Sequence, residues 1–123
     1  MDLLIIITYL IYGLLAAGLI FSGLGAIGLL RFPDVYTRLH AGTKCTTLGA
    51  ILISAAVVIY GFSLWYLNND SQYIILSVHV IVAVICLLIT NPTGAHAIAR
   101  AAHRSGIMPK RAVVDKLVEA KLK

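Results

Sequence analysis

The positions of the charged residues constrain this chain more than any other feature. Only fifteen of the 123 residues are Asp, Glu, Lys or Arg, and they leave three charge-free runs, at 3–30, 45–69 and 71–99. A helix needs about 20 mostly apolar residues to cross the hydrocarbon core of a membrane. Each run is long enough, so the sequence predicts an all-α integral membrane protein with transmembrane helices near 3–30, 46–67 and 73–90.

The overall composition excludes most other classes of protein. Apolar residues make up 60% of the chain and charged residues 12%, whereas soluble domains have roughly 45–50% and about 25%. A soluble domain of this size could not bury so much apolar surface. The first apolar run has no basic residue before it and exceeds the length of a signal-peptide core, so we expect it to be retained.

The distribution of Lys and Arg predicts the orientation in the membrane. None precedes the first run, three lie in the first loop (Arg31, Arg38 and Lys44), none lies between the second and third runs, and seven follow Ala99. Basic segments stay in the cytoplasm. We therefore expect a multi-pass protein of the cell membrane with its N-terminus outside and its C-terminus inside. The net charge of +5 has this explanation and does not indicate nucleic-acid binding.

Small residues recur at helical spacing in the first two runs. The series are Gly18, Ser22 and Ala26, with Gly25 beside them, and Thr46, Ala50 and Ser54. Small residues four positions apart let membrane helices approach closely. Two interpretations stay open: packing among the three helices of this chain, and docking into a larger membrane complex.

The first loop contains the most informative residues. Pro33 disfavours helix at the residue before it, so the first helix should end there. Asp34 is suited to cap a short interfacial helix, in which it pairs with Arg38 at the favourable spacing. His40 and Lys44 share a second face of that helix. The segment is either a solvated connection that fixes topology or the lining of an ion entrance.

His79 is the one ionisable side chain well inside a predicted span. Imidazole can carry protons near neutral pH, and it can equally form a hydrogen bond with a neighbouring helix. The substitution His79→Phe distinguishes these roles. If His79 carries protons, the substitution reduces cation-dependent proton exchange in the assembled complex; if it only forms a hydrogen bond, exchange is unchanged.

The third run continues past Asn91 and Pro92 into a basic segment. A straight helix over 73–104 would be about 48 Å long at 1.5 Å per residue, which exceeds the roughly 30 Å core. We therefore expect a kink, a strong tilt or a new helix near Pro92. Beyond it, His96, Arg100 and Arg104 share one face. Residues 109–123 form a basic tail with an amphipathic pattern, separate from the membrane domain at 1–108.

No pattern in the sequence indicates catalysis. The chain has no nucleophile triad, phosphate loop or paired carboxylates, and its two cysteines and four histidines lack the spacing of a metal site. We expect no catalytic residue, no metal ligand and no cofactor. No carboxylate lies within any predicted span, although ion transport through membranes relies on such groups. Partner chains would therefore have to supply the main ionisable residues.

Two stretches resemble one small membrane subunit. Residues 28–41, GLLRFPDVYTRLHA, are followed by Thr43-Lys44 and by TLG at 47–49, and residues 91–102 read NPTGAHAIARAA, with Gly106 beyond them. Together they are similar to the G subunit of Mrp-type multisubunit Na+/H+ antiporters, which recurs in membrane-bound hydrogenases and related respiratory complexes. Gly42, Cys45 and His103 depart from that family's pattern.

The resemblance implies an accessory subunit that works among other small and large membrane subunits of an antiporter-like complex. It implies Na+ and H+ as the transported ions and a role for Pro92 in transport or assembly. We expect the chain to pack the small-subunit bundle and to line part of a cation path near Asp34, His40 and Lys44. The alternative is a structural anchor of an oxidoreductase complex with no part in the ion path.

Overall fold

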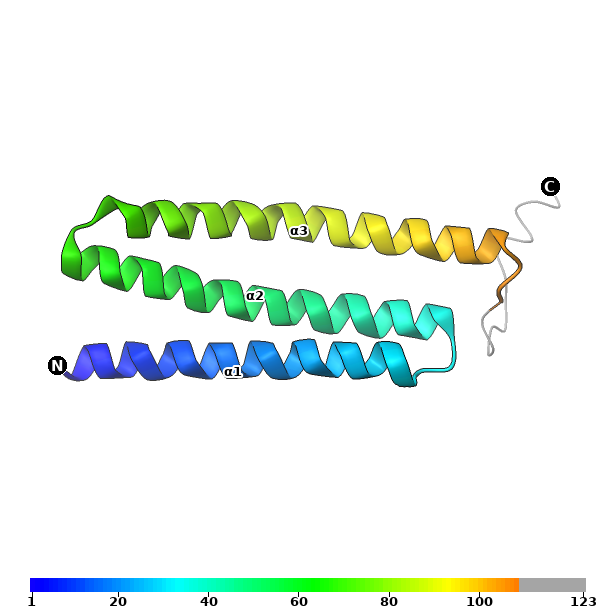
Figure 1. The fold of residues 1–123 in the computed structure, drawn as a ribbon, viewed down its shortest axis with the longest axis horizontal. Coiled ribbons are helices and arrows are strands. Elements are labelled where there is room, and N and C mark those ends of the chain that lie inside the picture. The colour runs from blue at the N-terminus through cyan, green and yellow to red at the C-terminus, as the bar shows by residue number, and fades with distance from the viewer. Residues whose placement is uncertain (109–123) are drawn as a thin grey trace.

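The computed structural model describes residues 1–108, which form three long helices (Figure 1). These are α1 (Asp2–Arg31), α2 (Val35–Asn68) and α3 (Ser71–Arg104). All three are long and apolar enough to cross a membrane, and no strand occurs among the described residues. The all-α fold with three membrane-spanning helices is therefore confirmed. The tail predicted at 109–123 lies outside the described residues.

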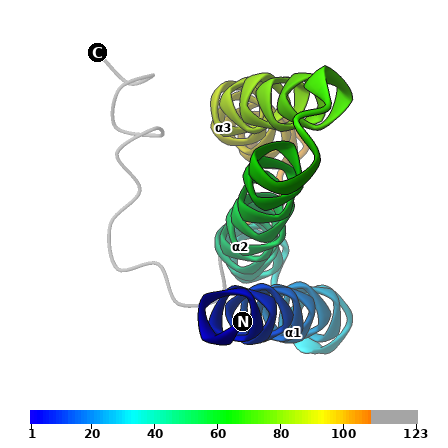
Figure 2. The same cartoon turned by 90° about the vertical axis from the view of Figure 1, so that its left-hand side faces the viewer.

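The three helices lie side by side in one layer, with α2 in the middle (Figures 1 and 2). Helix α2 contacts both neighbours, while no Cα atom of α1 comes within 8 Å of a Cα atom of α3. One end of the layer holds Met1 and the turn between α2 and α3, and we call it the turn end. The other holds the loop between α1 and α2 and the end of α3, and we call it the loop end.

The connections have local causes. Phe32 is extended, with φ −74° and ψ 136°, as expected for a residue before proline, so α1 ends where Pro33 predicts. At the turn end Asn69 takes a left-handed conformation with φ 56°, which ends α2. The carboxylate of Asp70 then accepts a hydrogen bond of 3.0 Å from the backbone N–H of Gln72 and caps α3.

The structure differs from the prediction of a separate interfacial helix in the first loop. Asp34 occupies the N-cap position of α2, and the segment from Val35 through Lys44 is the first part of that helix. The charges of this segment mark a membrane border, which need not coincide with a helix end. No proline interrupts residues 35–44, so the helical hydrogen bonds that begin at the first turn of α2 continue into the apolar run.

Helix α3 also continues where the sequence suggested a break, with Pro92 inside it. Proline removes the N–H that would bond the carbonyl of Leu88, and membrane helices tolerate this where nearby side chains compensate. The hydroxyls of Thr90 and Thr93 donate to the carbonyls of Cys86 and Ile89, at 2.7 and 2.9 Å. Neither bond reaches the carbonyl of Leu88, so α3 continues past Pro92 through the regular helical bonds on either side of it.

Every buried residue in the described part of the chain is glycine, alanine or serine. The nine are Gly18, Gly25, Gly28, Gly42, Gly49, Ala56, Gly61, Ser77 and Ala102. Large apolar side chains point outward instead, such as Leu19 at 65% and Ile20 at 62% exposure. The helices therefore meet through their backbones, and their apolar side chains are left for lipid or for other membrane helices.

Candidate functional site

Helices α1 and α2 meet most closely where Gly18 faces Gly49. A Cβ atom added at Gly18 would lie 2.9 Å from the carbonyl oxygen of Gly49, and one added at Gly49 would lie 2.8 Å from that of Gly18. Neither position has room for a side chain. The hydroxyl of Ser22 lies against Gly49 as well. This contact fixes the register of the first two helices.

The structure places the predicted packing residues in different environments. Gly18 is buried and Ser22 is half-buried in the α1–α2 contact, whereas Ala26 is exposed and Gly25 is buried in its place. Ala50 and Ser54 of α2 are half-buried.

Residues of α2 and α3 line an open groove of about 430 Å³ toward the loop end. Its surface is mainly apolar, like that of the other hollows, and we call it the polar groove only for the hydroxyl, amide and ammonium groups among its lining residues. Its lining residues are Thr43, Lys44, Thr47, Leu48 and Ile51 of α2 and Asn91, Pro92 and Ala95 of α3. Lys44 and Pro92, two predicted site residues far apart in the sequence, are thereby brought to one place.

A side-chain hydrogen bond closes the floor of the polar groove. The amide nitrogen of Asn91 donates to the hydroxyl oxygen of Thr47, across 44 positions of sequence. Thr43 and Asn91 also line a second hollow of about 340 Å³, which reaches Leu29 of α1. Asn91 therefore joins α3 to α2 at a point where both hollows meet, and its carbonyl oxygen is not used in that bond.

The polar groove offers oxygen atoms but no carboxylate. Among residues 1–108, Lys44 is the only charged residue that lines it. Within residues 1–108, no group of three His, Cys, Asp or Glu residues is placed to hold a metal ion. Hard cations prefer oxygen ligands, and the groove supplies these only as neutral hydroxyl and amide oxygens. The groove therefore offers a cation no negatively charged ligand from the described part of the chain.

The other predicted residues of the first loop lie nearer the loop end. Asp34 is half-buried at the start of α2, about 15 Å before Lys44 along the helix axis at 1.5 Å per residue. The guanidinium Nε of Arg38 donates to the carbonyl of Phe32 and holds the loop against α2. His40 is exposed one turn before Lys44. These residues approach the polar groove from one side without lining it.

His79 and His96 lie outside the polar groove. His79 is exposed in the half of α3 near the turn end, and its Nδ1 lies 2.8 Å from the carbonyl oxygen of Ile75. Because a carbonyl only accepts, Nδ1 carries the hydrogen in the neutral ring and Nε2 is left as an acceptor. His96 is exposed on α3 one turn beyond Pro92.

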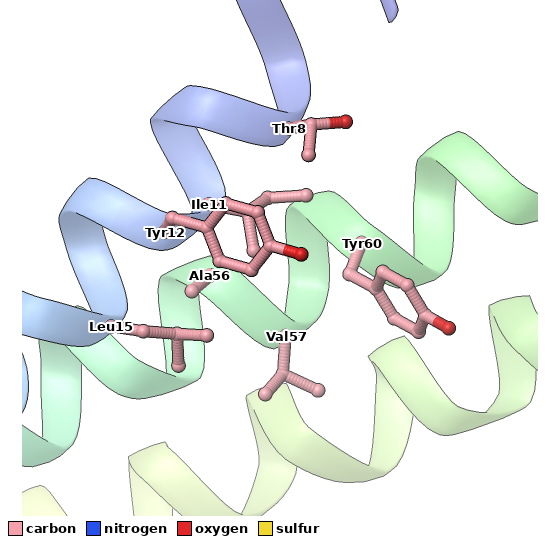
Figure 3. A pocket seen from close by; sticks show the side chains of 7 residues that line it. All are labelled: Thr8, Ile11, Tyr12, Leu15, Ala56, Val57 and Tyr60. Atoms are coloured by element: carbon pink, nitrogen blue, oxygen red, sulfur yellow. The ribbon is translucent and has the colours of Figure 1, made fainter. Parts of the chain in front are cut away.

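A third hollow, of about 330 Å³, separates α1 from α2 toward the turn end (Figure 3). Its lining residues are Thr8, Ile11, Tyr12, Leu15, Ala56, Val57 and Tyr60. Most of this lining is apolar, and the hollow contains none of the predicted site residues.

Sequence reasoning missed two features of the site. The bond between Asn91 and Thr47 depends on the register of two helices, which no local pattern reveals. The second feature is the set of buried glycines. Gly18 and Gly25 are seven positions apart, as are Gly42 and Gly49, and a search for four-residue spacing alone does not detect this repeat. Seven residues are close to two helical turns, so such positions stay on one face of a long helix.

Comparison with known proteins agrees with this architecture. The family model described as a Na+/H+ antiporter subunit matches residues 14–103. A UPF0091 protein of Pyrococcus horikoshii is 52% identical over 113 residues, which cover 92% of this chain and 93% of that protein. The antiporter subunit mnhG2 of Staphylococcus saprophyticus is 41% identical, over 81% of this chain and 66% of its own length.

A solved structure is similar over nearly the whole chain. It is a chain of the membrane-bound sulfane sulfur reductase, an archaeal respiratory membrane complex. The two chains superpose with a TM-score of 0.71 at 34% sequence identity, over 91% of this chain and 95% of that one. With residues 14–103 matched by the family model, this chain belongs to the family of Na+/H+ antiporter subunits.

Proposed function

We propose that this chain is an accessory membrane subunit of an Mrp-type cation/proton antiporter module, in which it packs the small-subunit bundle and lines part of the cation path. It contributes no catalytic residue of its own. The module belongs either to a free-standing antiporter or to a membrane-bound respiratory complex of the hydrogenase type. The similarity to antiporter subunits and to a chain of a respiratory complex supports both settings.

The packing role rests on the exposed apolar faces of the layer. Only small residues are buried between the helices, and α1 and α3 remain apart. Both sides of the layer therefore carry apolar side chains that lipid and the helices of other subunits can cover. Co-purification in mild detergent tests this role, because a chain that packs a subunit bundle is recovered with other membrane subunits and not as a homo-oligomer alone.

The polar groove is the observation that carries the transport role. Polar side chains are costly inside a membrane and mark functional sites there. The groove collects Thr43, Thr47 and Asn91 on the part of the layer nearest the basic segments. We propose that cations approach past Asp34, Arg38 and His40, that His96 lies at the same entrance, and that a partner subunit supplies a carboxylate opposite Lys44.

The proposed orientation follows from the same arrangement. The loop end holds Arg31, Arg38, Lys44, Arg100 and Arg104, whereas the turn end holds only Asp2 and Asp70 among the charged residues of the described chain. The positive-inside rule supports a cytoplasmic loop end and an external N-terminus. The polar groove then opens near the cytoplasmic border of the membrane.

The substitution Thr47→Val tests the transport role with little change in shape. It removes the hydroxyl that binds Asn91 and exposes the amide to an apolar neighbour. We expect assembly to persist and Na+-dependent proton exchange in membrane vesicles to fall several-fold. Thr93→Val is the matched control, because Thr93 is exposed on α3, does not line the groove and donates only to Ile89 of its own helix.

The alternative function is a purely structural anchor of an oxidoreductase complex. It predicts that Thr47→Val and Thr93→Val have the same exchange rate per assembled complex. Recovery of the chain with iron–sulfur or other oxidoreductase subunits would identify the host complex, and the exchange assay would still decide whether the groove takes part in transport.

A further inference from the structure

We infer that the part of α3 beyond Pro92 is a docking surface for an acidic segment of a neighbouring subunit, and that His96, Arg100 and Arg104 bind it. We call these three residues the basic row. The inference rests on the proposed cytoplasmic placement of the loop end. It concerns a surface outside the polar groove, of which only His96 lies at the proposed cation entrance.

The basic row faces away from the rest of the chain. His96, Arg100 and Arg104 follow one another at four-residue spacing and are all exposed. The opposite side of the same segment meets α2 through small residues, because Ala102 is buried and Ala95 and Ala99 are half-buried. The row is therefore open to another chain in the described part of the protein.

Acidic residues are scarce in the described chain. Its three acids are Asp2 and Asp70 at the turn end and Asp34 at the start of α2, and α3 itself contains none. The tail at 109–123 has five Lys or Arg and only two acids, Asp115 and Glu119. Its net charge has the same sign as the row, so electrostatics disfavours it as the occupant.

The length of α3 favours a protein partner over lipid headgroups. If Tyr73 marks the outer border, about 20 residues cross the hydrocarbon core, which places the inner border near residue 93. Arg104 then lies about 16 Å beyond that border at 1.5 Å per residue, whereas the headgroup layer is only about 5–7 Å deep. Lipid phosphates can therefore contact His96 but not Arg104. A protein segment with spaced carboxylates can contact all three residues of the row.

Cross-linking in the native complex identifies the occupant. A photoreactive benzoylphenylalanine in place of Ala97, which is exposed beside the row, is activated in the purified complex. We expect a cross-link to a segment of another subunit that is rich in Asp or Glu. Cross-links to lipid alone, or to a segment without acidic residues, would overturn the inference.

Relocating a charge separates the row from the total charge of the loop end. The variant Arg100→Ala with Ala101→Arg keeps the net charge but moves one cation off the row. Ala101→Arg alone keeps the row intact and is the control. At about 0.15 M salt, where only close charge pairs escape screening, we expect the relocated variant to be retained in the complex several-fold less than the unmodified chain, which has the same net charge. The control should be retained as well as the unmodified chain.

Equal retention of the relocated variant and the unmodified chain would contradict the inference. That result would leave the proposed function intact as long as the chain still co-purifies with other membrane subunits and Thr47→Val lowers exchange. Conversely, a chain that never co-purifies with membrane subunits would contradict the proposed function before the row is tested.

Discussion

The phenol hydroxyl of Tyr36 donates a hydrogen bond of 2.8 Å to the carbonyl oxygen of Ile107, a residue 71 positions later in the sequence. Gly106, with φ 83°, turns the chain back after α3, and the N–H of Ile107 donates to the carbonyl of Ala102 at 3.1 Å. This is a helix-ending glycine motif. It brings the chain beyond α3 against the first turn of α2, so that the loop end is tied together without a large buried side chain.

We predict that Tyr36→Phe loosens the loop end. A typical intramolecular hydrogen bond contributes about 0.5–1.5 kcal/mol, so the thermal midpoint of the purified complex should fall by a few degrees. Tyr66→Phe is the control, because Tyr66 is 84% exposed at the turn end. Equal midpoints for the two variants would show that the Tyr36 bond contributes nothing to stability.

Gly49→Ala should separate α1 from α2. The added Cβ would lie 2.8 Å from the carbonyl oxygen of Gly18 and against Ser22, and most of these neighbours are backbone atoms that cannot rotate away. Overpacking of this kind costs typically about 1–3 kcal/mol. We expect a lower thermal midpoint and less assembled complex on native gels.

Gly23→Ala provides the comparison on α1. No atom lies within 4 Å of a Cβ added there, and alanine is favoured over glycine inside a helix. This variant should match or exceed the unmodified protein in stability. If both alanine variants behave alike, the close contact at Gly49 does not determine helix packing.

The architecture could be predicted from the charge-free runs because membrane spans need length and apolarity, which are local properties. The end of α1 was predictable for the same reason, since Pro33 restricts only the residue before it. It was harder to predict that α2 includes the charged segment and that α3 continues through Pro92. Charges between Asp34 and Lys44 indicate a membrane border, and Pro92 indicates a missing backbone donor, but neither ends a helix whose neighbouring residues keep the backbone bonded.

The candidate site could be predicted only in part. Lys44 and Pro92 stood out as a charge and a proline at a membrane border, and the structure places both at the polar groove. Thr47 lies in the family-like stretch at 47–49, but its hydrogen bond with Asn91 could not be predicted, because that bond depends on the alignment of α2 with α3. That alignment arises from close contacts such as Gly61 against Tyr73, where a Cβ would lie 2.9 Å from the carbonyl oxygen.

We predict that His79 acts at a subunit interface. Its Nδ1 is engaged by Ile75, and Nε2 points out as an acceptor for a donor on a neighbouring helix. His79→Phe should lower the yield of assembled complex and leave the exchange rate per complex unchanged. A normal yield with slower exchange between pH 6 and 8 would instead assign His79 to proton movement.

We propose that cations pass through the polar groove, and chemical modification of Thr47→Cys is the sharpest test of this path. Cys45 and Cys86 are first replaced by Ser, and Thr93→Cys in the same background is the control outside the groove. Each assembled complex is treated with a thiol reagent that attaches a trimethylammonium group, and Na+-dependent proton exchange is measured in vesicles. We expect modification at residue 47 to abolish most exchange and modification at residue 93 to leave it unchanged. Full exchange by a complex whose residue 47 is demonstrably modified would rule out passage of cations through the groove.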